Sequence, residues 1–143
     1  MNKISIPLLL LTLICVVPML SAQEATFQVI VHPDNPTTTL PASQVAKLFL
    51  KQVTSWSHGG KVQPVDLDES APARIAFSEE ILGRSVAAVE SYWQQQIYSG
   101  RSVPPVKVRT DAEVVAYVKA NPTAIGYVSR GASTDGVKIV QVD

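Results

Sequence analysis

Strand and helix patterns alternate along this sequence, and they predict an α/β fold with a mixed sheet flanked by helices. Short β-branched runs are typical of strands that are buried on both faces of a sheet. The stretches between them place apolar residues at helical spacing. The sequence has 143 residues and contains no internal repeat or obvious linker. Because domains typically have about 100–150 residues, we expect one domain.

The first part of the sequence predicts a strand, a helix and a second strand. Residues 27–31 read FQVIV and are followed by a turn-rich segment, which predicts a buried strand that ends in a loop. Residues 42–51 place their apolar side chains three and four positions apart, which is typical of a helix with one buried face. Residues 61–67 form another short extended segment.

The central part predicts two helices and an extended segment. The first helix covers residues 71–82 and ends at Gly83, a residue type favoured just after a helix. The second covers residues 86–98, where apolar residues recur at helical spacing. Residues 103–108 are predicted to be extended because two consecutive prolines disfavour a helix there.

The last part begins with a helix signal and ends with two strand patterns. Thr110 and Glu113 have the spacing of a capping box, so a helix is predicted to begin at Asp111. Residues 124–128 and 137–142 are short β-branched runs separated by a glycine-containing loop.

The N-terminal 22 residues have the pattern of a secretory signal peptide. Lys3 precedes an apolar run over residues 4–20, and small residues follow it. The run has 17 residues and is too short to span a bilayer, which takes about 20. We therefore expect an exported, periplasmic domain over residues 23–143 that is not embedded in a membrane. The only cysteine of the sequence, Cys15, would be removed with the signal peptide. We therefore expect neither a disulfide nor a thiolate metal site in the exported domain.

Charge excludes some classes of partner. The sequence holds 12 Lys and Arg against 12 Asp and Glu, so its formal net charge is zero. The charged residues are scattered singly and form no basic stripe. Nucleic acids and anionic membrane surfaces are therefore poor candidate partners.

No arrangement of residues in the sequence indicates catalysis. His32 and His58 lie in separate turns without a ligand-spaced partner, and no nucleophile stands in a known catalytic motif. Asp66, Asp68 and Glu69 are best explained as acids near a helix start, with an acid/base pair or a hard-cation site as the alternative. We expect a protein that is not an enzyme and that has no metal and no cofactor.

One junction between a strand and a helix has the chemistry of an anion site. The Ser70 hydroxyl, the backbone amides near Ala71 and the Arg74 guanidinium fall within about one turn of the predicted helix start. We therefore name Ser70, Ala71 and Arg74 as the candidate oxyanion ligands. The alternative from the same residues is structural: Ser70 caps the helix and Arg74 pairs with a neighbouring acid.

A set of short motifs, in this order, resembles the binding-protein domain of phosphate ABC importers. The similarity is greatest to short, exported, single-domain proteins labelled as phosphate ABC transporter substrate-binding proteins, and it runs from about Phe27 to Val142. The motifs that carry it are Leu48-Phe49 with Trp56 and Gly59-Gly60, Tyr92-Trp93 with Gly100, Pro104-Pro105, and Ala124-Ile125-Gly126-Tyr127-Val128.

The resemblance implies a single lobe of a type II periplasmic-binding-protein fold. It also implies binding of phosphate or a similar oxyanion for an ABC permease. The family's Arg-x-Asp-Gly-Ser-Gly-Thr stretch falls on residues 67–73, where its arginine is Leu67 and Pro72 removes an amide donor. The alternative is therefore a periplasmic accessory protein that kept the fold, lost the ligand and binds an envelope protein. Such a protein would use an exposed patch that includes Trp56, Tyr98 or Tyr127.

Overall fold

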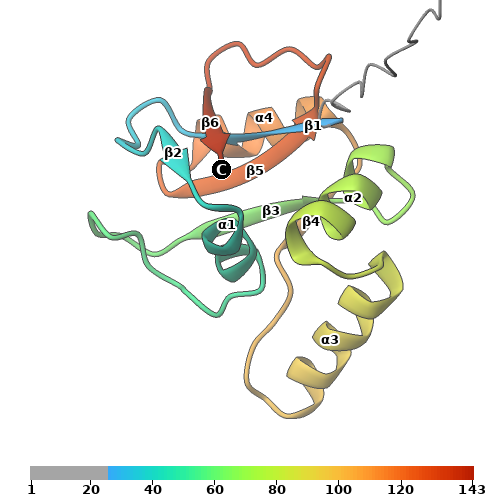
Figure 1. Ribbon diagram of the computed structural model, residues 1–143. Coiled ribbons are helices and arrows are strands. Elements are labelled where there is room, and N and C mark those ends of the chain that lie inside the picture. The colour runs from blue at the N-terminus through green and yellow to red at the C-terminus, as the bar shows by residue number, and fades with distance from the viewer. Residues whose placement is uncertain (1–25) are drawn as a thin grey trace, which may run out of the picture.

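The computed structural model describes residues 26–143, so the predicted signal peptide at residues 1–22 lies outside the described residues. Within that range, six strands form one mixed sheet with helices on both faces, as predicted (Figure 1). The strands are β1 (Phe27–Val31), β2 (Thr39–Leu40), β3 (Gln63–Leu67), β4 (Val106–Val108), β5 (Ala124–Ser129) and β6 (Lys138–Val142). The helices are α1 (Ala42–Phe49), α2 (Pro72–Phe77), α3 (Val86–Tyr98) and α4 (Asp111–Ala120), with one π-helical turn, η1 (Ser78–Leu82).

The order of the strands in the sheet is β2-β6-β1-β5-β3-β4. Strand β1 pairs antiparallel with both β5 and β6, whereas β5, β3 and β4 run parallel to one another. The carboxyl ends of these three parallel strands therefore lie at one edge of the sheet. Helices α2 and α4 follow β3 and β4, so both helices begin near that edge.

Consecutive residues of β5 show how the two faces of the sheet are covered. Gly126 faces α4, and a Cβ atom built there would lie 2.7 Å from Val114 Cγ1 and 2.8 Å from Val65 Cγ1. Tyr127 faces the opposite layer and stacks on Phe77 of α2, with ring centroids 3.9 Å apart. The alternation follows from strand geometry, because successive side chains point to opposite faces.

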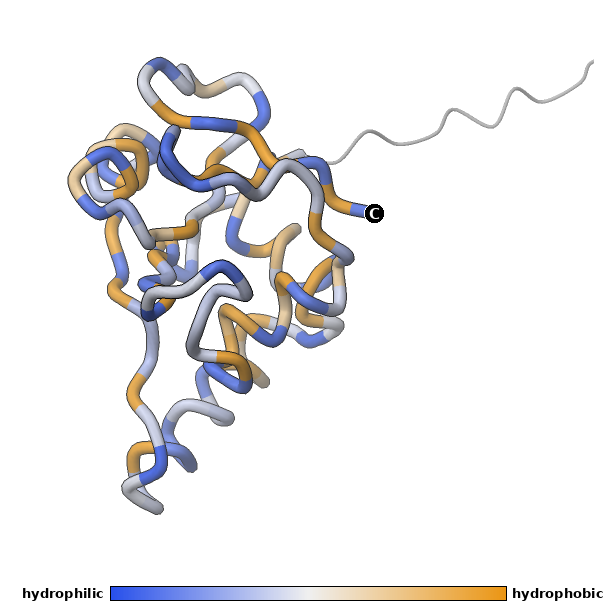
Figure 2. Tube along the Cα trace, turned by 90° about the vertical axis from the view of Figure 1, so that its left-hand side faces the viewer, coloured by the Kyte–Doolittle hydropathy of each residue, from blue (hydrophilic) through white to orange (hydrophobic). Residues whose placement is uncertain are grey.

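Helix α3 stands apart from the main core. It packs through Val89 and Trp93 against Leu50 in a small separate cluster. Its far end and the segment that follows it extend away from the sheet, at the bottom of Figure 2. Three of the exposed large apolar side chains lie there: Ile97, Tyr98 and Val103.

The predicted elements are present, with two differences. The expected helix over residues 71–82 is divided into α2 and η1. Ser78 is fully buried at this division, where its Oγ donates to the Arg84 carbonyl at 2.8 Å and its own carbonyl accepts from the Arg84 amide. The two-residue strand β2, which no sequence pattern indicated, forms because it pairs in parallel with β6 at the end of the chain.

We predict that the close approach at Gly126 makes this position intolerant of a side chain. Gly126→Ala should lower the free energy of unfolding by about 1–3 kcal/mol, because the new methyl group overpacks the contact with Val114 and Val65. Gly131→Ala is the matched control, since a Cβ there meets nothing within 4 Å. It should change stability by less than about 0.5 kcal/mol. Urea unfolding measures both, and equal midpoints for the two variants would contradict the prediction.

Candidate functional site

A cleft of about 440 Å³ lies at the edge of the sheet where the three parallel strands end. We call it the edge cleft. The cleft is formed by the segment between β3 and α2, the segment between β4 and α4, and the last residue of β5. Carboxyl edges of parallel strands are common ligand sites because loops and helix starts converge there. The cleft is lined by Leu67, Asp68, Ser70, Ala71, Pro72, Arg109, Thr110, Asp111 and Ser129.

Two of the three predicted ligands lie on the edge cleft. Ser70 is exposed, and its hydroxyl forms no hydrogen bond within residues 26–143. Ala71 is the N-cap of α2 and provides no side-chain cap, and Pro72 occupies the first helical position. The Ala71 amide already donates to the Asp68 carbonyl at 3.0 Å. Ser70 therefore has a free hydroxyl to offer a ligand, whereas the Ala71 amide is engaged in a turn.

The third predicted ligand, Arg74, lies inside the protein and does not line the edge cleft. Its side chain is 1% exposed, and its Nη1 lies 2.6 Å from Asp66 Oδ2 and donates to the Leu67 carbonyl at 3.1 Å. Its Nη2 donates to Glu90 Oε1 at 3.3 Å. The structure therefore brings Ser70 and Ala71 together but places the Arg74 guanidinium elsewhere. This geometry matches the alternative in which Arg74 pairs with neighbouring acids.

A buried network surrounds the Asp66 carboxylate. Asp66 Oδ1 accepts hydrogen bonds from the Tyr127 hydroxyl and from the Leu67 amide, the latter at 2.9 Å. Burial raises the pKa of the Asp66 carboxyl, while the Arg74 guanidinium and the two hydrogen bonds oppose that rise. Burial, and then the neighbouring Asp66, raise the pKa of Tyr127, so the phenol stays protonated as a donor. The Arg74 Nε is buried without a hydrogen-bond partner, whereas the charged and hydroxyl oxygen atoms of Asp66 and Tyr127 are paired within the network. None of Asp66, Arg74 and Tyr127 lines the edge cleft.

The acidic cluster noted in the sequence is divided among three environments. Asp66 is buried with Arg74, and Asp68 lines the edge cleft. Glu69 pairs with Lys107, whose hydrogen bond lowers the pKa of Glu69 to about 2. Among residues 26–143, no group of three or more His, Cys, Asp or Glu side chains is placed to hold a metal ion.

Sequence reasoning missed the second half of the edge cleft, which is the junction between β4 and α4. Arg109 is exposed there, and its guanidinium forms no ion pair within the described range. The predicted capping box is present: Thr110 Oγ1 accepts from the Glu113 amide at 3.2 Å, and Glu113 accepts in return. Asp111 Oδ1 accepts from the Ser129 amide at 3.0 Å and so joins α4 to β5. The missing signal was the parallel pairing of β3 and β4, which puts Arg109 and Ser70 on one edge.

Among residues 26–143, no helix is both long enough and apolar enough to cross a bilayer.

Comparison with protein-family models found no match, and neither did comparison with curated protein sequences. Comparison with solved structures did find similarity. An ABC-type phosphate transport receptor from Vibrio cholerae aligns with a TM-score of 0.64 and 22% identity. A putative phosphate ABC transporter substrate-binding protein with bound phosphate from Clostridium perfringens aligns with a TM-score of 0.64 and 24% identity. PstS from Borrelia burgdorferi aligns with a TM-score of 0.64 and 15% identity.

These alignments confirm the fold expected from the resemblance. Each covers 82% of this chain, and they cover 46%, 45% and 47% of the three solved chains in that order. The chain thus has the fold of one part of these proteins and spans about half of their length. At these identities, the similarity concerns the fold alone.

We predict that Arg74 stabilises the fold rather than a ligand. Arg74→Met keeps the length of the side chain but leaves the Asp66 carboxylate buried without its cation. The free energy of unfolding should fall by about 3–5 kcal/mol near neutral pH. The loss should be smaller at acid pH, because the raised pKa of Asp66 lets its carboxyl become neutral.

Urea unfolding at two pH values measures this loss, with Arg109→Met as the matched control. Arg109 is exposed and lacks an ion pair among the described residues, so its variant should stay within about 0.5 kcal/mol of the parent. Equal unfolding midpoints for Arg74→Met and Arg109→Met would show that the buried pair contributes nothing.

Proposed function

We propose that this chain is an exported, non-enzymatic solute-binding domain that takes a small oxyanion, phosphate foremost, in the edge cleft. The observation that carries the proposal is the meeting of two strand-to-helix junctions at one carboxyl edge. One junction supplies the Ser70 hydroxyl, and the other supplies the Arg109 guanidinium and the Thr110 hydroxyl. The shared fold with phosphate receptors supports the same ligand class.

The charges of the edge cleft favour an oxyanion that carries a proton. Arg109 contributes one positive charge, and Asp68 and Asp111 contribute two negative charges, so the lining side chains sum to minus one. An ionised carboxylate can only accept a hydrogen bond, so it repels a fully ionised anion but can accept from a protonated one. Hydrogen phosphate has such a proton and sulfate does not at neutral pH. We therefore expect the cleft to prefer phosphate to sulfate.

Arg74 has an indirect part in the proposed site. By donating to the Leu67 carbonyl, it fixes the end of β3 directly before the turn that carries Ser70. Arg74 is thus a positioning residue in this proposal and makes no contact with the anion. The Ala71 amide helps to shape the same turn through its bond to Asp68.

The edge cleft alone should bind its ligand weakly. It is open to solvent and covers the ligand from one side only, while tight small-molecule sites bury most of the ligand surface. Delivery to an ABC permease in the periplasm is the transport role that we propose for such a domain. A second protein surface over the cleft would strengthen the binding.

The accessory-protein alternative has less support from the described residues. It expected an exposed patch that includes Trp56, Tyr98 or Tyr127. Trp56 is buried and donates from Nε1 to the Thr123 carbonyl at 2.9 Å, and Tyr127 is buried with Asp66. Only Tyr98 is exposed.

We predict that inorganic phosphate moves the amide resonances of residues 68–71 and 109–111 saturably in a ¹⁵N NMR titration. Sulfate should move them less at the same concentration. Arg109→Gln should weaken phosphate binding by about tenfold or more, because it removes a charge-assisted hydrogen bond. Ser70→Ala should weaken it by a smaller factor.

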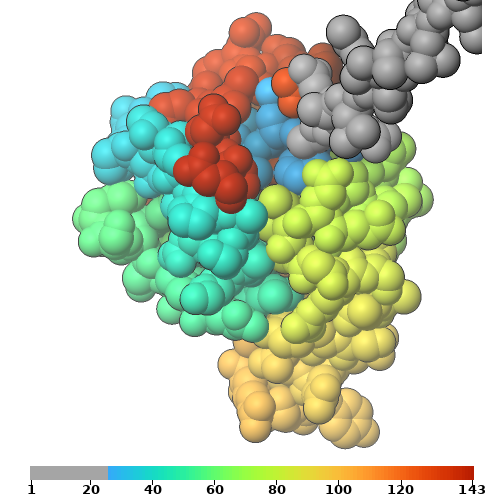
Figure 3. Space-filling model, in the orientation of Figure 1, coloured from blue at the N-terminus to red at the C-terminus, as the bar shows by residue number. Residues whose placement is uncertain are grey.

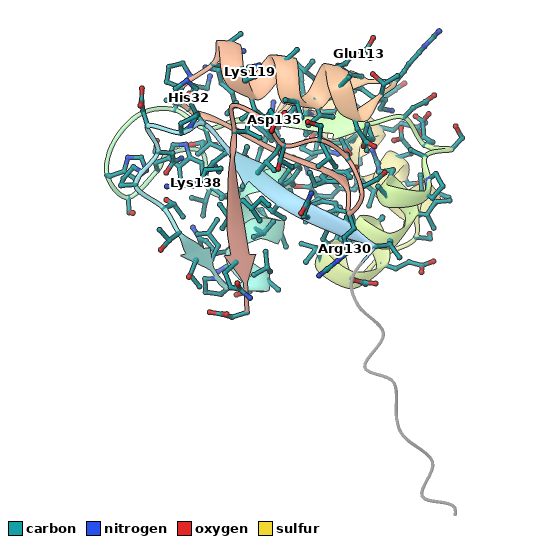
Figure 4. All side chains as sticks on the ribbon, turned by 90° about the horizontal axis from the view of Figure 1, so that it is seen from above. His32, Glu113, Lys119, Arg130, Asp135 and Lys138 are labelled. Carbon is teal, nitrogen blue, oxygen red and sulfur yellow. The ribbon has the colours of Figure 1, made fainter. Side chains whose placement is uncertain are left out.

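Lys119→Gln is the control for the loss of one positive charge. Figure 4 shows Glu113 and Lys119 toward opposite ends of α4. The edge cleft lies at the Glu113 end, since Thr110 and Asp111 line it. This control should bind phosphate as the parent does. The proposal fails if phosphate causes no saturable shift at residues 68–71 and 109–111, or if Arg109→Gln and Lys119→Gln bind phosphate equally well.

A further inference from the structure

A second cleft, of about 340 Å³, lies at the other end of β3 from the edge cleft. It is formed by the end of α1, the segment that leads from α1 to β3, and the segment that follows α3. Near the bottom of Figure 3, the teal atoms that follow α1 lie next to the yellow-orange atoms that follow α3. No residue lines both clefts. We call this second one the basic cleft.

The charged side chains that line the basic cleft are all positive: Lys51, Lys61 and Arg101. None of these three cations forms an ion pair within residues 26–143. The sequence explains why, because residues 42–65 and 91–110 contain no Asp or Glu. A chain with a net charge of zero has therefore gathered unpaired cations around one concave surface. Such a surface attracts anions.

Lys51 shows that this positive charge is uncompensated. Burial, and then the neighbouring Lys61, lower the pKa of the Lys51 ammonium. Its Nζ reaches only the Pro104 carbonyl, at 3.5 Å. An anion between Lys51 and Lys61 would reduce the repulsion between their two positive charges, so the charges of the cleft favour anion binding.

The backbone of Lys51 is also unusual. It has a φ of 55° directly after the end of α1, where the Gln52 amide closes the helix by donating to the Lys47 carbonyl. Glycine is the residue usually found at this position because a Cβ is disfavoured there. The chain thus keeps a lysine side chain at a position where glycine would fit with less strain.

The rest of the basic cleft is largely apolar. Leu48, Val53 and Val62 line it from the body, and Ile97 and Val103 line it from the region of α3. Ile97 is 52% exposed and Val103 is 61% exposed. Contact with hydrocarbon would remove this apolar surface from water.

We propose that the basic cleft binds an amphipathic organic anion. Its acidic head, a phosphate monoester or a carboxylate, lies between Lys51, Lys61 and Arg101. Its hydrocarbon part covers Ile97 and Val103. A single small molecule fits the concave shape and volume of the cleft, which is in the range of ligand pockets. This site is separate from the edge cleft and does not depend on phosphate binding there.

NMR titration of the protein with octyl phosphate, below its micellar concentration, tests the proposal. Saturable shifts are expected at residues 51–54, 61–62 and 97–103 and not at residues 68–71 or 109–111. Butyl phosphate should bind at least about tenfold more weakly, because each buried methylene is worth about fourfold in affinity. Octanoate tests whether a carboxylate head is also accepted and should shift the same residues. Octyl glucoside, which is uncharged, should cause no saturable shift.

Variants connect the binding to the three cations. Lys51→Gly should weaken octyl phosphate binding by about threefold while the urea midpoint stays equal or rises, since glycine relieves the positive φ. The triple variant Lys51→Gly, Lys61→Gln, Arg101→Gln should lose binding. Lys119→Gln is the matched control, because Lys119 lines neither cleft, and it should bind octyl phosphate as the parent does.

Three results would overturn the proposal. The first is equal binding of octyl phosphate and octyl glucoside. The second is unchanged affinity in the triple variant. The third is sedimentation with phosphatidylglycerol vesicles without binding of monomeric octyl phosphate, which would identify a membrane surface instead. Because inorganic phosphate and octyl phosphate are followed at different residues, this proposal and the proposed function can fail independently.

Discussion

Burial of the Arg74 guanidinium against Asp66 is the constraint on which the arrangement at the end of β3 depends. Arg74 is the largest fully buried side chain among the described residues, and burying a cation is costly unless an opposite charge pairs with it. Asp66 supplies the opposite charge from β3, and Glu90 supplies a second one from α3. Lys107 of β4 also contacts Glu90, so one set of charges joins four elements. Through these pairs, Arg74 connects α2 to both β3 and α3.

The same pairing decides which residues remain for a ligand. Because Arg74 is engaged inside, the edge cleft depends on the next junction along the sheet for its cation. Arg109 stands at that junction because β4 is parallel to β3 and ends in register with it, at Leu67 opposite Val108. The site is thus assembled from two loops about 40 residues apart in the chain. The loop before α2 contributes the Ser70 hydroxyl but no cation to the cleft, and the loop before α4 contributes the Arg109 cation.

The sequence allowed the elements to be predicted better than the site. The capping box at Thr110 and the helix over residues 86–98 depend on neighbours in the sequence, and local spacing was sufficient for both. The sequence did not reveal that Arg74 is buried against Asp66, because which acid is buried depends on tertiary packing. Ser70, Ala71 and Arg74 lie close together in sequence, but Ser70 and Ala71 line the edge cleft whereas Arg74 lies inside the protein. Arg109 was missed because strand register cannot be read from one sequence.

A net charge of zero conceals an uneven distribution of charge in this protein. Acids and one arginine share the edge cleft, where Asp68 and Asp111 flank the position proposed for the anion. Cations without acids share the basic cleft at the opposite end of β3. In the edge cleft, the two carboxylates favour an anion that can donate a hydrogen bond. They also repel any anion, so this selectivity would lower the affinity. In the basic cleft, no carboxylate limits which anions the cations attract. The exposed apolar side chains would therefore have to supply the selectivity. The two proposed sites would therefore recognise anions by opposite physical means.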